Sequence, residues 1–152
     1  MDISKTCAFT GHRETENDID LSYIEDCVRG IIGEGYDIFL CGMAWGFDLL
    51  AASAVLRLKS EYPHIKLIAC VPCPGQERNF PADEKIKYGE ILKNCDEVRV
   101  LSKNFYKGCM YARNRYMVDN CAALLAYERR QEGGTHYTLK YAKDKSKKIF
   151  IV

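Results

Sequence analysis

The chain has 152 residues, of which 47% are hydrophobic and 28% are charged, and its formal net charge is +1 at pH 7. This composition excludes a mainly disordered chain, and the near-zero charge argues against bulk electrostatic binding to nucleic acid or to an anionic membrane. No apolar run approaches the roughly 18 residues that a transmembrane helix needs, and the first residues lack a signal-peptide pattern. We therefore expect a cytoplasmic protein that forms one domain over residues 1–152, with no membrane partner.

Short apolar runs alternate with amphipathic stretches of helical length along the chain. In chain order they predict a strand at 6–10, a helix at 18–33, a strand at 37–41, a helix at 47–61, a strand at 66–71, a loop at 72–82, a helix at 83–94, a strand at 97–101, a helix at 109–119, a strand at 122–127, a helix at about 134–144 and a strand at 148–152. Such alternation indicates βαβ units with right-handed crossovers. The predicted fold class is α/β, with a single doubly wound, mainly parallel sheet of about six strands and helices on both faces.

Polar and glycine-containing loops follow several of these strands. In a doubly wound sheet, ligands bind outside the carboxyl ends of the strands, near the point where the strand order reverses. After the first strand comes Thr10-Gly11-His12-Arg13. Glycine permits a tight turn there, and Arg13 offers a planar fork of donors to a phosphate. We expect these four residues at a ligand, although a turn glycine followed by exposed polar residues would give the same pattern.

The loop after the second strand places Gly42 and Gly46 at the start of a helix. Glycines at a helix N-terminus free the backbone N–H groups to face an anion, which the helix dipole also favours. Asp48 lies in the first helical turn, where it either bonds a ribose hydroxyl or caps the helix. Trp45 or Tyr127 is expected to stack on a base. No Gly-Lys-Ser/Thr follows, so the loop is not a Walker motif.

Three more segments add candidate ligand contacts. The helix at 109–119 carries Arg113, Asn114 and Arg115. The two arginines point to different sides, so one is expected to face the ligand and the other a structural carboxylate, unless both are solvated. Gly133-Gly134-Thr135 opens the last helix as a second candidate anion cradle, with the threonine hydroxyl as cap or phosphate donor. Gln76, in the loop at 72–82, is expected to reach the ligand.

The cysteines are interpreted as reduced thiols, because most lie in or beside apolar strand-like runs. Cys70 and Cys73 have thioredoxin spacing, but they lie at the end of a strand with no helix start for the first thiol, so redox activity is not expected. Zinc would need two further ligands, and only Cys41 and His12 are plausible sources, so a zinc site is not expected. We therefore predict no metal and no certain cofactor beyond a nucleotide-type ligand.

Taken together, these loops resemble the YpsA-like family of the SLOG superfamily of Rossmann-type proteins, nearly end to end. The resemblance rests on Phe9-Thr10-Gly11-His12-Arg13, Cys41-Gly42-Met43-Ala44-Trp45-Gly46-Phe47-Asp48, Pro72-Cys73-Pro74-Gly75-Gln76, Gly108-Cys109-Met110, Arg113-Asn114-Arg115-Tyr116-Met117-Val118-Asp119 and Gly133-Gly134-Thr135. It implies a Rossmann-like sheet and a nucleotide or nucleotide-derived ligand. It does not by itself imply an activity.

Two related groups offer partial matches. The segment from Gly42 to Asp48 looks like the corresponding part of the DNA-processing protein DprA/Smf, and Arg113 with the later glycines looks like the LOG phosphoribohydrolases. The LOG enzymes carry Pro-Gly-Gly-x-Gly-Thr-x-x-Glu, whose glutamate helps to cleave a glycosidic bond. Here the proline is missing, and Tyr137 or Thr138 takes the place of that acid. Cleavage of an N-glycosidic bond is harder without a carboxylate at this position.

These observations favour a protein that binds or senses an ADP-ribose-like or NAD-like ligand at the carboxyl edge of the sheet. One alternative is an N-glycoside hydrolase acting on nucleoside monophosphates, in which Arg113 orients the phosphate and Asp119 or Glu128 acts as acid or base. Another is an interaction or regulatory protein with a degenerate pocket. In that case a homodimer is plausible, since the helices carry many aromatic residues: Tyr111, Tyr116, Tyr137 and Tyr141.

Overall fold

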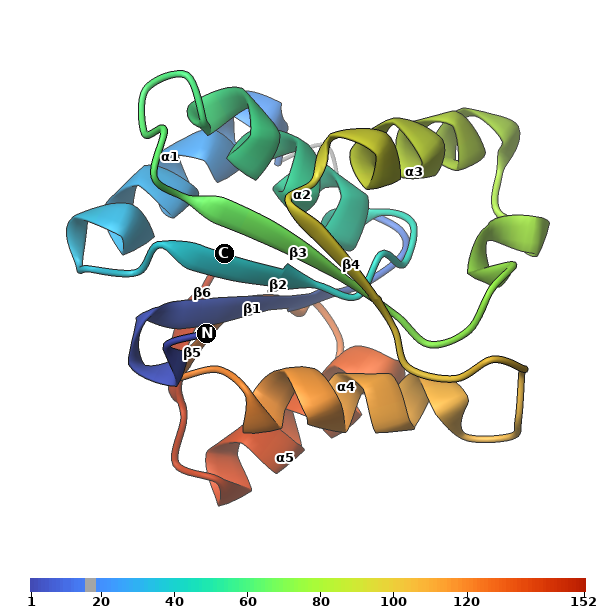
Figure 1. Ribbon diagram of the computed structural model, residues 1–152. Coiled ribbons are helices and arrows are strands. Elements are labelled where there is room, and N and C mark those ends of the chain that lie inside the picture. The colour runs from blue at the N-terminus through green and yellow to red at the C-terminus, as the bar shows by residue number, and fades with distance from the viewer. Residues whose placement is uncertain (16–18) are drawn as a thin grey trace.

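The computed structural model describes residues 1–15 and 19–152, and within them the strands form one six-stranded sheet (Figure 1). The strands are β1 (Thr6–Gly11), β2 (Ile38–Cys41), β3 (Lys66–Val71), β4 (Glu97–Val100), β5 (Ala123–Tyr127) and β6 (Lys148–Ile151). Their order is β4-β3-β2-β1-β5-β6, and every neighbouring pair is parallel. The order reverses at β1, because β2, β3 and β4 extend to one side of it and β5 and β6 to the other.

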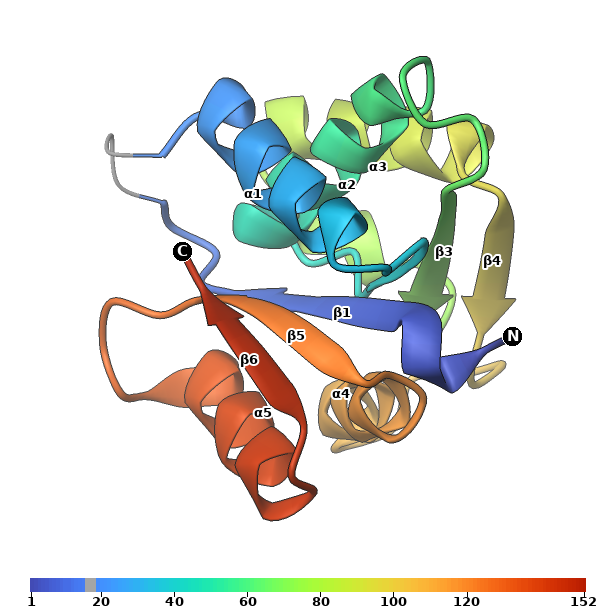
Figure 2. The same cartoon turned by 90° about the vertical axis from the view of Figure 1, so that its left-hand side faces the viewer.

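Helices cover both faces of this sheet. One layer holds α1 (Leu21–Gly33), α2 (Phe47–Leu58) and α3 (Ala82–Asn94), and the other holds α4 (Cys109–Asp119) and α5 (Gly133–Asp144) (Figure 2). Two short 3-10 helices, η1 (Ile3–Lys5) and η2 (Gln76–Asn79), complete the fold. The doubly wound α/β class predicted from the sequence is confirmed, and the sheet is wholly parallel.

Small differences from the expected boundaries have local causes. The helix expected from residue 18 begins at Leu21, because Asp20 caps it by accepting a hydrogen bond from the amide of Tyr23 at 2.8 Å; residue 18 itself lies outside the described residues. The helix expected to reach residue 61 ends at Leu58, in a turn before Pro63. The predicted loop at 72–82 contains η2.

The core fixes the position of β1 at the centre of the molecule. Phe9 on β1 stacks on Phe39 of β2 at 5.8 Å between ring centroids and meets Phe47 of α2 edge-on at 6.4 Å. The side chains of Cys7 and Phe9 join the cluster beneath α1, α2 and α3, whereas Ala8 joins the cluster beneath α4 and α5. This alternation buries both faces of β1, as a central parallel strand requires. The end of β1 therefore opens onto the crevice where the strand order reverses.

No helix among the described residues is long and apolar enough to cross a membrane.

Candidate functional site

A cavity of about 790 Å³ lies at the carboxyl ends of the strands. Its wall is built by the end of β1, by the loop between β2 and α2, by η2, by α4 and by the first turn of α5. The predicted ligand residues that line it are Thr10, Gly11, His12, Arg13, Trp45, Asp48, Gln76, Arg113, Asn114, Gly133, Gly134 and Thr135. Segments more than a hundred residues apart in the sequence thus meet at the position that strand order predicts for a ligand.

His12 joins the loop after β1 to the loop after β5. Its backbone N–H donates to the carbonyl of Tyr127 at 3.3 Å, and its side-chain Nε2 accepts from the amides of Arg129 at 2.9 Å and Arg130 at 3.3 Å. An Nε2 that accepts cannot carry the proton of a neutral ring, so the proton is on Nδ1. Burial, reinforced by the charge of Arg130, lowers the pKa of His12, which favours this neutral form.

Two glycines allow α2 to pack against the end of β1. A Cβ on Gly11 would lie 2.4 Å from Cδ2 of Phe47. A Cβ on Gly46 would lie 2.0 Å from the carbonyl oxygen of Arg13, and Gly46 also has a φ of +85°, which a residue with a side chain rarely adopts. These positions are glycine because the two backbones approach each other closely.

The loop between β2 and α2 is not an open anion cradle. The amide of Ala44 donates to Oδ2 of Asp48 at 3.3 Å, and the amide of Gly46 donates to Oε1 of Glu84 at 3.2 Å. Two carboxylates of the protein thus occupy positions where a phosphate would bind. Asp48 holds the loop that precedes its helix, and the N-cap position belongs to Gly46.

Gly42 does not line the cavity but anchors its wall. Its carbonyl oxygen accepts hydrogen bonds from Nη1 of Arg113 and from Nε2 of Gln76, the latter at 3.0 Å. The other end of the Gln76 amide, Oε1, accepts from the hydroxyl of Tyr88 at 3.2 Å. Neither Gly42 nor Gly46 is therefore among the residues that face the cavity, in contrast to the sequence-based expectation. Gln76 does face it, and its amide positions the wall.

Arg113 is a buried cation directed into the cavity. Its side chain is only 5% exposed, and its Nε donates to Oδ1 of Asn114 at 2.8 Å. The described residues supply no hydrogen-bond partner for its remaining amino nitrogen, Nη2. Burial lowers the pKa of Arg113 and raises that of nearby Asp48 to about 6, while the guanidinium opposes the latter shift. Arg113 thus lines the cavity, whereas Arg115 bonds the hydroxyl of Tyr137 at 2.8 Å rather than the structural carboxylate expected for one of the two arginines.

The N-terminus of α5 leaves its first amides open. No described residue accepts a hydrogen bond from the amides of Gly133, Gly134 or Thr135, and the N-cap residue Glu132 makes no side-chain capping bond. Nδ2 of Asn114 is 3.9 Å from the position that a Cβ on Gly134 would take. The Oδ1 atom of Asn114 already accepts a hydrogen bond from Arg113, so the N–H groups of the Asn114 side chain are directed to the start of α5. Free amides, a helix dipole and two side-chain donors therefore converge.

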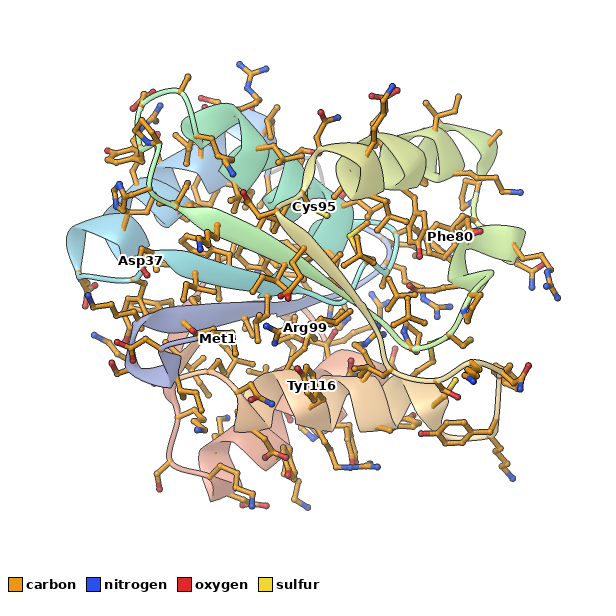
Figure 3. All side chains as sticks on the ribbon, in the orientation of Figure 1. Met1, Asp37, Phe80, Cys95, Arg99 and Tyr116 are labelled. Atoms are coloured by element: carbon orange, nitrogen blue, oxygen red, sulfur yellow. The ribbon has the colours of Figure 1, made fainter. Side chains whose placement is uncertain are left out.

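Aromatic side chains differ in whether a base could reach them. Tyr127 has no exposed surface: its ring stacks on Phe47 at 5.6 Å, and the guanidinium of Arg129 lies 4.2 Å from its centroid. It cannot stack on a ligand, in contrast to the sequence-based expectation. Trp45 is half-buried at the cavity, with Arg13 on its ring at 4.3 Å and Phe80 beside it at 5.0 Å. Figure 3 shows Phe80 between η2 and α3, at the outer end of this wall.

The carboxylates proposed for catalysis lie elsewhere. Asp119 is exposed at the last turn of α4 and accepts from the hydroxyl of Tyr141 at 2.8 Å. Glu128 contacts Nδ1 of His136 at 3.3 Å. Neither residue lines the cavity. Glu132 does, but it forms an ion pair with Arg130 at 2.7 Å.

Sequence reasoning missed several cavity residues. They are Phe9, Ala44, Asn79, Phe80, Met110, Tyr111, Met117, Arg130 and Glu132. Asn79 and Phe80 belong to the segment expected to be an irregular loop, and the polar loop at 128–132 was not assigned individual contacts. The sequence signal that would have found them is the presence of aromatic and cationic residues beside the glycine turns at the same sheet edge.

The thiols of Cys70 and Cys73 lie outside the cavity lining. Burial raises the pKa of Cys70 to about 11 and also raises that of Cys73, where the neighbouring Cys109 thiol adds to the rise. A thiol with a raised pKa is a poor nucleophile at neutral pH. All eight cysteines are free in the structure.

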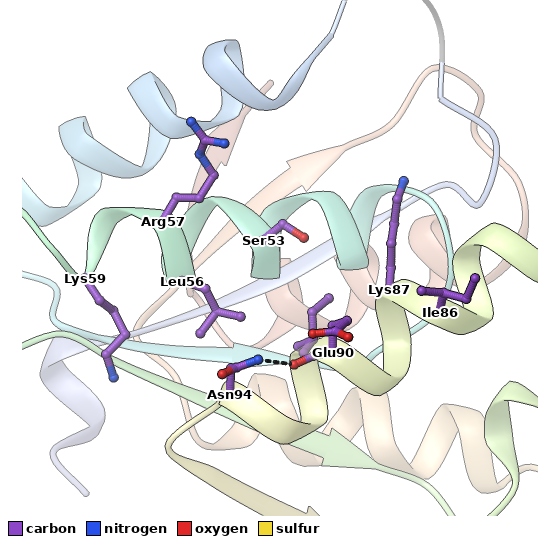
Figure 4. Close-up of a pocket in the computed structure, with 9 residues that line it drawn as sticks. Ser53, Leu56, Arg57, Lys59, Ile86, Lys87, Glu90 and Asn94 are labelled. Carbon is purple, nitrogen blue, oxygen red and sulfur yellow. Dashed lines mark hydrogen bonds between the residues drawn. The ribbon is translucent and has the colours of Figure 1, made fainter.

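A second hollow, of about 490 Å³, lies between α2 and α3 (Figure 4). Its cations already have carboxylate partners: Arg57 pairs with Glu25 at 2.8 Å, and Lys59 pairs with Asp96 at 2.5 Å. It also lies on helix faces rather than at strand ends. The cavity at the carboxyl edge is therefore the stronger candidate for ligand binding.

The fold and the position of the cavity define a Rossmann-like α/β protein with its site at the topological switch point. A model of the YspA SLOG family, named YpsA, matches residues 7–151. The chain belongs to the YpsA family of SLOG proteins.

Individual relatives agree with this assignment. The UPF0398 protein BH1768 of Halalkalibacterium halodurans is 32% identical, with 91% of this chain and 80% of that protein covered. The UPF0398 protein YpsA of Bacillus subtilis is 28% identical, with 89% and 82% covered. The prophage-derived protein YoqJ of the same organism is 35% identical, with 69% and 68% covered.

Two solved structures share the fold at low sequence identity. DNA processing protein A (DprA) from Streptococcus pneumoniae superimposes with a TM-score of 0.70 at 19% identity, covering 97% of this chain and 50% of that chain. DprA from Helicobacter pylori, whose structure describes a single-stranded DNA binding mode, gives 0.71 at 20% identity, with 96% and 64% covered. This chain thus spans half to two-thirds of the length of these neighbours.

Proposed function

We propose that this protein binds or senses a nucleotide-derived ligand of the ADP-ribose or NAD type, with a phosphate at the N-terminus of α5. The observation that carries the proposal is the set of unpartnered donors at one end of the cavity: the amides of Gly133, Gly134 and Thr135, Nη2 of Arg113 and Nδ2 of Asn114. Donors with no protein acceptor at a helix N-terminus suit phosphoryl oxygens.

The remainder of the cavity suits the nucleoside part of such a ligand. The volume of about 790 Å³ lies in the range of small-molecule sites. Trp45 and Phe80 provide aromatic surface at one wall. Asp48 supplies a buried carboxyl that can accept a hydrogen bond from a ribose hydroxyl whether it is ionised or protonated.

A small ligand is favoured over bulk nucleic-acid binding. The formal net charge of the chain is +1, and neutralisation of many phosphates requires a basic surface. The Helicobacter neighbour nevertheless is described with single-stranded DNA, so an oligonucleotide belongs in the ligand panel. Hydrolysis of an N-glycosidic bond is less favoured, because Asp119 and Glu128 do not line the cavity.

Isothermal titration calorimetry with ADP-ribose, NAD⁺, AMP and a short single-stranded DNA tests the proposal. Asn114→Asp removes a donor and places a negative charge beside the phosphate, so we expect it to weaken ADP-ribose binding by more than about tenfold. Asn104→Asp is the matched control, since Asn104 is exposed and lies outside the cavity. Failure of every nucleotide to bind, or equal weakening by the two variants, would refute the proposal. Chromatography for released base on the same samples tests the hydrolase alternative.

A further inference from the structure

A smaller hollow of about 360 Å³ adjoins the cavity on its outer side, between the start of α4 and the first turns of α5. We call it the outer hollow, and its lining residues are Tyr106, Lys107, Gly108, Tyr111, Arg115 and Tyr137. Tyr111 lines both spaces, so the two spaces meet at this residue. A ligand in the cavity therefore has a direct neighbouring space into which it can extend.

The walls of the outer hollow are aromatic and cationic. The rings of Tyr111 and Tyr137 meet edge-on with centroids 4.6 Å apart. Nη1 of Arg115 donates to the hydroxyl of Tyr137 at 2.8 Å and holds that ring in place. Tyr106 and Tyr111 remain 50% and 44% exposed, so their faces are accessible. Ordered rings beside a cation form a stacking platform for a base that carries phosphate.

The position of the platform matches the proposed phosphate site. Tyr137 lies on α5 only three residues after Gly134, which corresponds to a rise of about 4.5 Å along the helix. A phosphate at the first amides of α5 would therefore lie within about one helical turn of a residue that lines the outer hollow. A base attached through that phosphate on the far side from the cavity would reach the tyrosine rings.

We propose that the outer hollow receives a second base, so that the ligand consists of two bases joined through phosphates. This inference rests on the proposed function, because the phosphate at α5 sets the direction of both halves. Two sources supply such a ligand: a dinucleotide such as NAD⁺ or diadenosine diphosphate, or adjacent nucleotides of a single strand. Both share the arrangement of base, phosphate and base.

The experiment compares dissociation constants for ligands that differ in the second base. ADP-ribose has two phosphates and one base, whereas diadenosine diphosphate has two phosphates and two bases. We expect the second ligand to bind about tenfold more tightly, because one base–aromatic stack is gained. In Tyr137→Ala the ratio of the two constants should fall toward one. Tyr23→Ala, an exposed tyrosine on α1 in the opposite helix layer, should leave the ratio unchanged.

Each other outcome has a definite meaning. If ADP-ribose binds but the second base gives no gain, or the gain survives Tyr137→Ala, the outer hollow is not a base site and the proposed function stands. If no ligand binds, both proposals fail. A gain seen with a deoxydinucleotide but absent with diadenosine diphosphate identifies a strand as the source. A loss of dimer mass on sedimentation of Tyr137→Ala, without a change in the ratio, would make the hollow an interface and overturn the inference.

Discussion

The buried carboxyl of Asp48 gives the protein a pH-dependent stability that can be measured directly. Its pKa is raised from 3.8 to about 6, chiefly by burial, so the folded protein binds this proton more tightly than the unfolded chain does. The contribution of Asp48 to the free energy of unfolding is then largest below about pH 4 and decreases as the pH rises to about 6. Above that pH it no longer changes with pH. About two pKa units correspond to about 3 kcal/mol.

The perturbation is Asp48→Asn, which keeps the shape and removes the titration. The absolute stability of the variant has opposing contributions, because Arg113 loses a nearby negative charge while a desolvated carboxylate is removed. The pH dependence of the free energy of unfolding is free of this ambiguity, since Arg113 remains charged at every pH of the series. Between pH 4 and 6, the stability of the parent relative to the variant should fall by up to about 1.4 kcal/mol per pH unit.

The assay is urea unfolding of both proteins at a series of pH values from 4 to 8. Asp26→Asn serves as the control, because Asp26 is an exposed carboxylate on α1 whose side chain is 73% accessible. Its profile should run parallel to that of the parent. Parallel profiles for the parent and Asp48→Asn would refute the argument that burial holds this carboxyl neutral near pH 5.

Three further predictions follow from the same contacts. Gly46→Ala should destabilise the fold by more than about 2 kcal/mol, because its Cβ would clash with the carbonyl oxygen of Arg13 and its φ is positive. Gly30→Ala, in open space on α1, should stabilise the fold slightly. Thermal denaturation measures both changes. His12→Phe removes the ring nitrogen that accepts from the amides of Arg129 and Arg130 and should cost about 0.5–1.5 kcal/mol in urea unfolding, and no loss would contradict the joining role. ADP-ribose should bind about three- to tenfold more tightly at pH 5 than at pH 7, because its diphosphate keeps its charge while Asp48 is neutralised beside Arg113. Calorimetry at the two pH values measures this gain. No gain, or an equal gain in Asp48→Asn, would contradict the prediction.

Local sequence signals were sufficient for the elements and insufficient for part of the site. Apolar runs such as Lys66–Val71 predicted buried strands because a central parallel strand must be apolar on both faces. The glycines at 42 and 46 predicted an anion cradle from local spacing alone. In the structure the amide of Gly46 donates a hydrogen bond to Glu84, which lies on a different helix 38 residues later in the sequence. No local sequence pattern contains that contact.

Helix geometry explains the placement of the proposed catalytic acid. Arg113 lies in the second turn of α4, at the cavity, and Asp119 is the last residue of the same helix. Six residues of helix correspond to about 9 Å along the axis, which carries Asp119 away from the strand ends. The amides of Gly133, Gly134 and Thr135 stay open because no carboxylate of the described residues accepts a hydrogen bond from them. The outcome at each glycine turn thus depends on long-range neighbours.

The most direct test of the central claim is a crystal structure of the protein with ADP-ribose bound. We expect a phosphoryl oxygen within about 3 Å of the amides of Gly133–Thr135, with Nη2 of Arg113 and Nδ2 of Asn114 donating to the same group. A phosphate bound between α2 and α3, or at the loop after β2 with Glu84 displaced, would contradict it.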